Sequence, residues 1–348
     1  MRHEALSRYA ALLVLACAAV TVTLACASSV RSHSATGECS VVVRPGVGLE
    51  RTVKAARPGD TICLRAGDYD ANRLPIRVSG KAGARITLRS EIARRPATIH
   101  GVVYLADSAN YWTFEDLHLD GRNRWNLPSP IVNGDHSIWR RLDVTNHHAG
   151  AGTSGGGICC SLGQTKRYGY AGDTTIEDSR IHDCGVSDNH NHGIYVTATS
   201  GLTIVRDNWI YRNGDRGIQL YPAAANVLIT HNAIDDNGSG VIFSGVGSLT
   251  SHSIRVVGNI ISNSRNRWNV ESWYPSGTPV GTGNVVTGNC LWASNSNPQY
   301  DENSGIAPPV GFKVGSANVT QQPDFRVTDG VLTRSGAGGC RGYGPRTS

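Results

Sequence analysis

One sequence unit occurs three times in succession between residues 175 and 243. Each copy starts with a short β-branched run, continues with a polar residue two places before an isoleucine, and closes with a Gly–apolar–x–apolar step. The isoleucines are Ile181, Ile210 and Ile234, and the glycines are Gly193, Gly217 and Gly240. Self-similarity at this spacing is typical of a solenoid, in which each unit buries its apolar face only against its neighbours.

The two landmarks of the unit can be followed beyond these three copies. The isoleucine landmark recurs at Leu119, Val144, Ile181, Ile210, Ile234, Ile261 and Leu291. The apolar residue of the glycine landmark recurs at Val102, Ile131, Ile158, Ile194, Ile218, Val241 and Val270. A unit of this length accommodates two or three short strands, which is one turn of a parallel β-helix. The sequence therefore predicts an all-β solenoid with turns from about Ile86 to Leu291.

Residues 1–27 have the features of a secretory signal. Arg2 and Arg8 supply a charged start, residues 10–27 carry no charge, and Ala25-Cys26-Ala27 fits a small-x-small cleavage site. We therefore predict a signal peptide at 1–27 and a secreted or extracytoplasmic, cell-envelope location. In an alternative interpretation, Cys26 is acylated and forms a lipid anchor. No later segment is apolar enough to cross a bilayer, so we expect no membrane span.

Nine cysteines are present, and two of them lie in the predicted signal peptide. An exported chain is expected to form disulfides. The expected pairs are Cys39–Cys63, Cys290–Cys340, and Cys184 with either Cys159 or Cys160, which leaves one thiol free. No CxxC or cysteine–histidine spacing typical of a metal site accompanies these residues, so we expect no metal.

Residues 48–69 combine an amphipathic helix, a Pro-Gly turn and a strand. Leu49, Val53 and Ala56 lie on one helical face, and Pro58-Gly59 ends the helix. This segment resembles the cap of right-handed parallel β-helices of the pectate-lyase-like superfamily, and the resemblance extends over roughly residues 39–295. It implies a right-handed parallel β-helix at 28–297 whose short N-terminal capping helix covers the apolar end of the first turn. The tail at 298–348 lacks the repeat and is expected to pack on or cap the β-helix.

Asparagine recurs at one position of successive turns, at Asn208, Asn232, Asn259 and Asn289. Such a ladder could bind a ligand. However, stacked turns leave backbone polar groups that inward asparagine side chains can satisfy, and buried polar groups are nearly always paired. We therefore favour a structural role for these residues.

A group of polar and aromatic residues falls on one side of the predicted solenoid. His192 and Arg216 precede the glycines of adjacent turns, so their backbones should lie about 4.8 Å apart. Strand alternation points Tyr195 outward, with Gln219 and Glu271 on the same ladder. The candidate catalytic residues are His192, Arg216, Tyr195 and Tyr221. The candidate substrate-binding residues are His190, Lys166, Arg167, Gln219, Arg267, Trp268, Glu271 and Trp273, of which Lys166 and Arg167 lie in an insertion in the longest turn.

These side chains suit an acidic sugar chain. Arginine holds a carboxylate through two hydrogen bonds, and aromatic faces stack on sugar rings. The charge of Arg216 would lower the pKa of His192, which favours a neutral histidine that acts as a base, with Tyr195 or Tyr221 as the acid. The competing interpretation makes His192 and Arg216 turn residues that hydrogen-bond to neighbouring turns. The formal charge of +6 suits an acidic partner.

The resemblance to β-helix families implies no single reaction, because the relatives include polysaccharide lyases, uronate epimerases and glycoside hydrolases. The His-Gly-Ile and Arg-Gly-Ile steps at 192–194 and 216–218 are similar to steps in mannuronan epimerases and some lyases, but Asp188-Asn-His190 replaces the epimerase Asp-Pro-His element. Unlike in polygalacturonases, Asp235-Asp236 is followed by Asn-Gly, and no Gly-His-Gly occurs. No cluster of acids recurs at one position, so calcium is unsupported and we expect no cofactor.

We therefore expect an exported protein that acts on an acidic, uronate-containing polysaccharide by β-elimination. We expect it to be a monomer and to have no nucleic acid partner. One alternative is a non-catalytic cell-envelope protein that binds glycan or protein through the same side. Another is a glycoside hydrolase that uses Glu271 with Asp188 or Asp215.

Overall fold

The computed structural model describes residues 38–46, 48–122, 126–147, 157–186, 190–300, 304–336 and 338–346. Residues Glu38–Ser348 form one compact unit. The predicted signal peptide, with Cys26 as its alternative lipid anchor, lies outside the described residues. Within the described ranges, no helix has both the length and the apolar character needed to cross a membrane.

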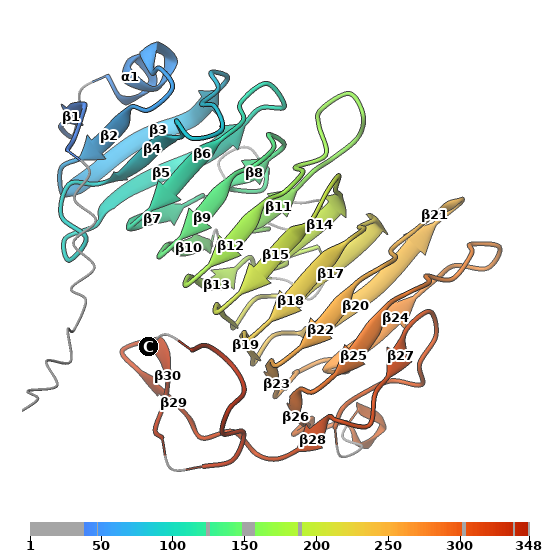
Figure 1. Ribbon diagram of the computed structural model, residues 1–348. Helices are drawn as coiled ribbons and strands as arrows, with labels where there is room; N and C mark the ends of the chain where they lie inside the picture. The colour runs from blue at the N-terminus through green and yellow to red at the C-terminus, as the bar shows by residue number, and fades with distance from the viewer. Residues whose placement is uncertain are drawn as a thin grey trace, which may run out of the picture. The chain divides into compact units, whose positions relative to one another are not determined.

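Parallel strands stacked turn upon turn form a solenoid with three faces (Figure 1). The first face consists of β1 (Val41–Val43), β2 (Thr61–Leu64), β4 (Ile86–Ser90), β6 (Trp112–Glu115), β9 (Ile138–Arg140), β12 (Thr175–Glu177), β15 (Thr203–Arg206), β18 (Val227–Thr230), β22 (Arg255–Val257), β25 (Val285–Thr287) and β27 (Lys313–Val314). The second face consists of β3 (Gly67–Ile76), β5 (Ala97–Leu105), β7 (Leu117–Asp120), β10 (Asp143–Asn146), β13 (Arg180–Cys184), β16 (Trp209–Tyr211), β19 (Ala233–Asp235), β23 (Ile260–Ser262), β26 (Cys290–Trp292) and β28 (Val319–Thr320).

The third face carries the candidate site. Its strands are β8 (Ile131–Val132), β11 (Cys160–Leu162), β14 (Ile194–Ala198), β17 (Arg216–Ala223), β20 (Ser239–Val246) and β24 (Val270–Trp273), and the long strands β3 and β5 continue into it. A short strand, β21 (Leu249–Thr250), pairs with the end of β20 in an antiparallel hairpin. Each turn runs from the first face to the second and then the third, so residues far apart in sequence become neighbours.

The prediction of an all-β, right-handed parallel β-helix with a short N-terminal helix is confirmed. The helix, α1 (Leu49–Ala55), buries Leu49 and Val53 against the first turns, and Ala56 packs beside them. The isoleucine landmark is also confirmed. Its residues align in consecutive strands of the second face, namely Leu119, Val144, Ile181, Ile210, Ile234, Ile261 and Leu291.

The glycine landmark is confirmed from Ile194 to Val270 but is wrong in the earlier turns. Ile131 pairs with Tyr104 and Ser161, two and three residues away from the predicted partners. The reason lies in Gly101, which is inside β5 and has a φ of 106°. A Cβ atom at this position would lie 2.5 Å from the backbone of β3, so only glycine fits. That glycine serves the bend of a long strand and does not mark the start of the third face.

Stacked asparagines close the corner between the first and second faces. The Oδ1 atom of Asn232 accepts hydrogen bonds from the backbone and side-chain N–H groups of Asn208, both at 3.0 Å. The same pattern continues through Asn259 and Asn289 to Asn318. The residue before each of the four predicted asparagines has a left-handed backbone conformation that turns the chain. The structural role predicted for this ladder is confirmed, and a second ladder of Asn213 and Asn237 closes the next corner.

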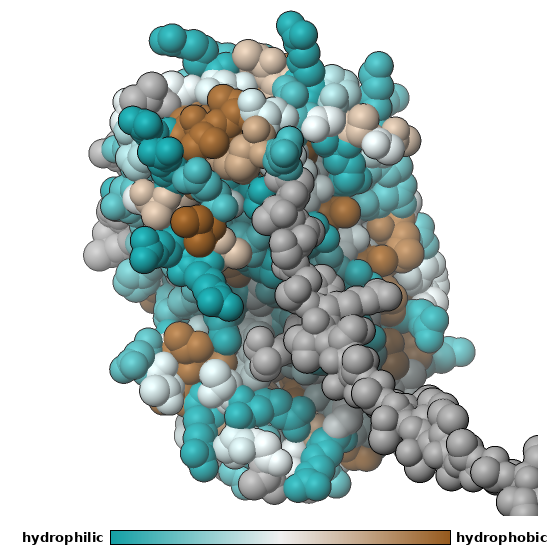
Figure 2. All heavy atoms as spheres, turned by 60° about the vertical axis from the view of Figure 1, so that its left-hand side comes forward, coloured by the Kyte–Doolittle hydropathy of each residue, from teal (hydrophilic) through white to brown (hydrophobic). Residues whose placement is uncertain are grey.

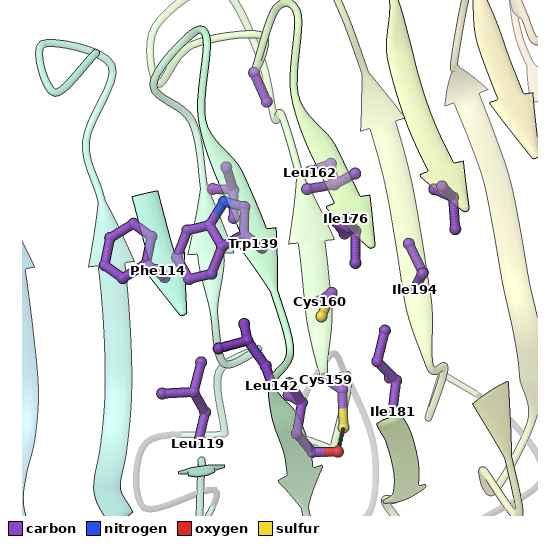
Figure 3. Packing of buried hydrophobic residues seen from close by; sticks show 14 of the residues in the cluster. Phe114, Leu119, Trp139, Leu142, Cys159, Cys160, Leu162, Ile176, Ile181 and Ile194 are labelled. Atoms are coloured by element: carbon purple, nitrogen blue, oxygen red, sulfur yellow. Dashed lines mark hydrogen bonds between the residues drawn. The ribbon is translucent and has the colours of Figure 1, made fainter. Parts of the chain in front are cut away.

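One hydrophobic core fills the interior between the three faces. Figure 3 shows the rings of Phe114 and Trp139 lying face to face, with their centroids 3.9 Å apart. Ile181 from the second face and Ile194 from the third lie in the same interior and are fully buried (Figure 3). Burying a side chain of this size contributes roughly 1.5–3 kcal/mol. The core therefore fixes the backbone that carries the outward side chains.

Three disulfides link the described residues, namely Cys39–Cys63, Cys159–Cys184 and Cys290–Cys340. The first and third pairs are as predicted, and the partner of Cys184, left open by the sequence, is Cys159. Cys160 is a buried free thiol that lies among the core residues (Figure 3). Three disulfides fit a location outside the reducing cytoplasm.

The sheets continue past residue 297, where we expected the turns to end. β27 pairs with β25, and β28 pairs with β26. The remaining chain, residues 321–346, is the C-terminal arm, which contains the antiparallel hairpin of β29 (Phe325–Thr328) and β30 (Val331–Arg334). Leu332 packs against Trp209 and Tyr211 of the second face, and Arg346 forms an ion pair of 2.6 Å with Asp207. The arm thus folds back over the outer side of the second face.

Oppositely charged residues alternate along the outer side of the first face. The aligned residues are Arg89, Glu115, Arg140, Glu177 and Arg206. Arg140 pairs with Glu115 at 2.6 Å, and Arg206 pairs with Glu177. Such cross-strand pairs stabilise adjacent turns by roughly 0.2–1 kcal/mol each. On the side of the molecule in Figure 2, hydrophilic residues dominate and apolar residues form small separate patches.

Candidate active site

A cavity of about 660 Å³ opens on the outer side of the third face. Its volume lies within the range of small-molecule binding sites. It is formed by β14, β17, β20 and β24 together with the segments that precede them in the chain. The lining residues are Ile158, His190, His192, Tyr195, Arg216, Gln219, Tyr221, Ile242, Arg267, Glu271, Ser272 and Trp273.

Glycine at the corner before the third face explains how the repeat places functional side chains. A Cβ on Gly217 would lie 2.6 Å from Cγ2 of Ile234, a core residue of the next turn, so no side chain fits there. The preceding residue, Arg216, lies instead on the cavity wall. Gly193 and His192 repeat this arrangement one turn earlier. The Gly–apolar step is thus a packing requirement that also positions the residue before it.

Strand alternation supplies the rest of the cavity wall. Tyr195 pairs with Gln219, Gln219 with Ile242, and Ile242 with Glu271, in a ladder across four turns. Tyr221 lies two residues after Gln219 and therefore points to the same side. All five side chains line the cavity.

Asp215, a fully buried acid, connects the charged residues of the site. Its Oδ2 atom accepts a hydrogen bond from Nη1 of Arg216 and another from the backbone N–H of His190 at 3.3 Å. Its Oδ1 atom accepts a hydrogen bond from Nη2 of Arg267. Nδ1 of His192 lies 3.3 Å from Oδ2 but makes no hydrogen bond with the described residues.

Arg267 bridges Asp215 to a second carboxylate. Its Nε atom donates to Oε1 of Glu271 at 3.0 Å, and the hydroxyl of Ser239 donates to the same oxygen at 2.7 Å. Glu271 is only 8% exposed although it lines the cavity. The two arginines at the cavity are therefore already matched by two carboxylates.

His192 is held in its neutral form. Burial lowers its pKa well below the usual range, and the positive charges of Arg216 and Arg267 lower it further. A neutral, buried imidazole can accept a proton at neutral pH. The lowered pKa of His192 is thus consistent with the hypothesis that this residue acts as a base.

Several buried polar atoms at the cavity have no hydrogen-bond partner among the described residues. They are Nδ1 of His192, Nε of Arg216 and Oε1 of Gln219. Leaving such groups unpaired costs about 1–3 kcal/mol each. Three of them in one cavity indicate a site prepared for a polar ligand.

Aromatic residues lie beside these groups. The rings of His192 and Tyr195 have centroids 5.6 Å apart, and burial raises the pKa of Tyr195 to about 12. Tyr195 therefore keeps its proton at neutral pH. Tyr221 and Trp273 lie 6.3 Å apart, and Trp273 is 54% exposed. The exposed ring of Trp273, with the half-buried Tyr221 beside it, offers a surface on which a sugar ring can stack.

The structure brings together nine of the twelve predicted site residues. They are His190, His192, Tyr195, Arg216, Gln219, Tyr221, Arg267, Glu271 and Trp273. Lys166 and Arg167 do not line the cavity and lie instead in the loop between β11 and β12 (Figure 1). Trp268 also lies outside the lining, and its ring packs edge-on against Tyr300, 5.4 Å away.

Some residues of the cavity were not predicted from the sequence. Asp215 was considered only as a hydrolase carboxylate, and Ile158, Ile242 and Ser272 were not considered. Ile242 lies on the outward ladder, so alternation from Gln219 would have found it. Asp188 lies outside the described residues. Within the described ranges, no group of three or more His, Cys, Asp or Glu side chains is placed to hold a metal ion.

A family model described as the right-handed beta helix region matches residues 143–305. The chain is similar to the crystal structure of an alginate lyase from Paenibacillus sp. str. FPU-7, with a TM-score of 0.53 and 17% identity over 80% of this chain and 98% of that chain. It is also similar to pectate lyase Pel9A, with a TM-score of 0.56 and 15% identity over 89% of this chain and 90% of that chain.

No curated protein matches the sequence. Similarity at these identities establishes the fold, while the reaction has to be argued from the site. The family model, the three-faced solenoid and the two solved structures agree. The chain has a right-handed parallel β-helix fold, which it shares with the two solved structures.

Proposed function

We propose that this protein is an exported carbohydrate-active enzyme that cleaves a uronate-containing polysaccharide by β-elimination. The observation that carries the proposal is the convergence of His192, Arg216 and Tyr195 on one cavity, where one polar atom of each of the first two is buried without a partner among the described residues. The two solved structures with the same fold are an alginate lyase and a pectate lyase, which supports a polysaccharide as substrate. The three disulfides support export.

Each residue has a role in the proposed reaction. Arg216, with Arg267 beside it, holds the carboxyl group of the uronate unit. His192 takes the proton from the carbon next to that group, and the electrons of the broken C–H bond form a carbon–carbon double bond. The bond to the bridging oxygen breaks, and this oxygen receives a proton from Tyr195 or Tyr221. The products are a new sugar end and an unsaturated uronate end.

Tyr195 is the stronger candidate for the acid. Its ring lies close to that of His192, and its pKa of about 12 keeps it protonated. Tyr221 forms the aromatic pair with Trp273 and is better placed to stack on a sugar. The polymer would then extend from the stacking pair across the cavity.

The environment of Asp215 favours elimination over hydrolysis by Glu271 with Asp215. A glycoside hydrolase needs two carboxyl groups that face the bond from opposite sides. Asp215 is fully buried, and both of its oxygens are bound to arginines. Glu271 is therefore left as the carboxylate that lines the cavity among the described residues.

The test is an ultraviolet assay for new unsaturated uronate ends. The purified protein is incubated with pectate, alginate, glycosaminoglycans and other uronate polymers, with and without calcium. We expect a rising signal on one polymer class, which would identify the substrate. A flat signal on every polymer would overturn the proposal. New reducing ends without an ultraviolet signal would indicate hydrolysis, and binding without either signal would indicate a non-catalytic glycan-binding protein.

A further inference from the structure

A second cavity, of about 310 Å³, lies on the outer side of the second face and shares no lining residue with the candidate active site. Side chains of β7, β10 and β13 form its floor, and Ala93 and Pro96 line it from the loop between β4 and β5. The other lining residues are Asp116, His118, Arg141, Leu142, Asp143, Asp178 and Arg180. Nη1 of Arg180 donates to the backbone carbonyl of Leu332 at 2.8 Å, so the C-terminal arm lies next to the cavity at its other end.

Six polar side chains of this cavity form two parallel rows. The first row follows the corner between the first and second faces and consists of Asp116, Arg141 and Asp178, all with a left-handed backbone conformation. The second row lies on aligned positions of β7, β10 and β13 and consists of His118, Asp143 and Arg180. Adjacent turns are about 4.8 Å apart, so carboxylates alternate with nitrogen-bearing side chains at that spacing along both rows.

Charges of both signs are already matched at the cavity. Arg141 donates to both carboxylate oxygens of Asp116, at 2.7 and 2.9 Å, and Asp143 forms an ion pair of 3.0 Å with His182. Three carboxylates and two guanidinium groups line the cavity, so a simple anion or a simple cation would meet its own sign as well as the opposite one. An uncharged ligand avoids this conflict. Carboxylate oxygens have two lone pairs each and can accept from such a ligand while they remain paired.

Two donors at the cavity are available to a ligand. His118 is exposed and forms no hydrogen bond or ion pair with another described residue. Arg180 lies over the ring of Trp209 at 5.6 Å and donates from Nη1 to the arm, but it forms no ion pair within the described ranges. A guanidinium group has five N–H donors, so most of those of Arg180 remain for other partners. The cavity therefore presents unused donors beside carboxylate acceptors.

Neutral saccharides match this arrangement. Each sugar hydroxyl donates one hydrogen bond and can accept others, so neighbouring hydroxyls can bind to a row in which donors and acceptors alternate. Leu142 and Pro96 supply a small apolar surface for the C–H groups of a sugar ring. The volume is at the lower end of the range for small-molecule sites, which suits a short stretch of a sugar chain.

We propose that the cavity on the second face binds a neutral saccharide and is a second glycan site, separate from the candidate active site. The inference goes beyond the proposed function and does not depend on it, because no residue of the second cavity has a part in the proposed reaction. With both sites occupied, the protein would hold a neutral glycan on one face while a different face acts on the acidic polymer.

The experiment measures the binding of cellohexaose, xylohexaose, mannohexaose and galactohexaose by calorimetry and by saturation-transfer NMR, with hexagalacturonate as the anionic comparison. We expect one of the neutral hexasaccharides to bind. Ala93→Trp places a large ring from the exposed loop into the cavity and should weaken that binding by about tenfold or more. His118→Ala removes one available donor and should weaken it by about fivefold, the loss expected for one hydrogen bond.

Ala82→Trp is the matched control for the bulky replacement. Ala82 is also exposed, but it lies outside the lining of both cavities, so this variant should bind the saccharide as the wild type does. Melting curves check that the variants are folded. Formation of unsaturated ends from uronate polymers should be the same in Ala93→Trp as in the wild type, because the two cavities lie on different faces.

Each remaining outcome overturns the inference. It is refuted if none of the neutral hexasaccharides binds, or if hexagalacturonate binds more tightly than all of them and Ala93→Trp abolishes its binding. Saccharide binding that Ala93→Trp and His118→Ala leave unchanged, but that Trp273→Ala removes, would place the ligand in the candidate active site instead. Failure of the lyase assay leaves the inference standing, so the two proposals are tested separately.

Discussion

Oδ2 of Asp215 lies 3.3 Å from Nδ1 of His192, and both side chains are shielded from solvent. The same carboxylate bonds to Arg216 and Arg267. Asp215 therefore lies next to the neutral His192 and forms salt bridges with both arginines. Replacing Asp215 should therefore change both the rate of the reaction and its dependence on pH.

Asp215→Asn should lower kcat by about 100-fold, because Arg216 and Arg267 lose the charged partner that positions them. The acid limb of the pH profile should also move to lower pH. Without the carboxylate, the two arginines act on His192 uncompensated and lower its pKa further, so His192 stays neutral to a lower pH. A pH–rate profile together with a melting curve measures both effects. A variant with the wild-type rate and the wild-type profile would refute this role for Asp215.

His192→Ala and Arg216→Ala test whether these residues perform catalysis or shape the turn. For the histidine variant we expect turnover to fall by about 10²–10⁴-fold, the usual contribution of a positioned base. We expect the melting temperature to stay close to that of the wild type, because the packing constraint resides in the adjacent glycines. Arg255→Ala, at an exposed position of the first face, is the control. Loss of folding in place of loss of turnover would support the turn interpretation.

His182 predicts how stability depends on pH. Burial lowers its pKa, but the bonds to Asp143 at 3.0 Å and Asp183 at 2.6 Å outweigh burial and raise it to about 9. The unfolded value is about 6.5, so the stabilisation is complete below that pH and is lost as the pH rises through about 9. The corresponding change in the free energy of unfolding is on the order of 3 kcal/mol.

Denaturant unfolding at several pH values checks this prediction. The wild-type protein should lose stability between about pH 6.5 and 9, and His182→Gln should show a flatter profile over that interval. His252→Gln serves as a control, because His252 is an exposed histidine whose side chain lies within hydrogen-bonding distance of Ser253. Equal slopes for the wild type and His182→Gln would contradict the assignment.

Cys340→Ser should loosen the C-terminal arm. The Cys290–Cys340 bridge closes a loop of 50 residues, and a loop of that length is worth about 4 kcal/mol. We expect a lower melting temperature and faster hydrogen exchange in β29 and β30, while the turns around the cavity keep their protection. Cys160→Ala removes the free thiol as a comparison. Unchanged exchange in the hairpin would show that Leu332 and Arg346 hold the arm without the disulfide.

Much of the fold could be predicted because a solenoid repeats its constraints. The isoleucine landmark was aligned correctly through all seven turns, since each of these residues must face the same core. The glycine landmark failed at Gly101, where glycine serves a strand bend and not a corner. A repeat pattern in the sequence indicates that a position is occupied by glycine. It does not show which neighbouring atoms would clash with a side chain there.

The candidate site was predictable only where it followed the repeat. Alternation and the glycine steps predicted that Tyr195, Gln219 and Glu271 share one outward ladder, and the strand register confirms that ladder. The loop with Lys166 and Arg167 does not repeat, so nothing in the sequence fixed its direction. Trp268 packs on Tyr300, a residue beyond the last predicted turn. Asp215 is connected to the site through a salt bridge to Arg267, a residue 52 positions away, which no local pattern reveals.

The asparagine ladders and the corner glycines hold the turns together without the outward side chains of the third face, such as Tyr195, Gln219 and Tyr221. Substitutions at those positions alter what the surface recognises while the stack beneath keeps its shape. In evolutionary terms, a lineage with this architecture can exchange one chemistry for another through a handful of surface replacements. Engineers can use the same freedom by grafting new side chains onto β14, β17, β20 and β24 without redesigning the interior.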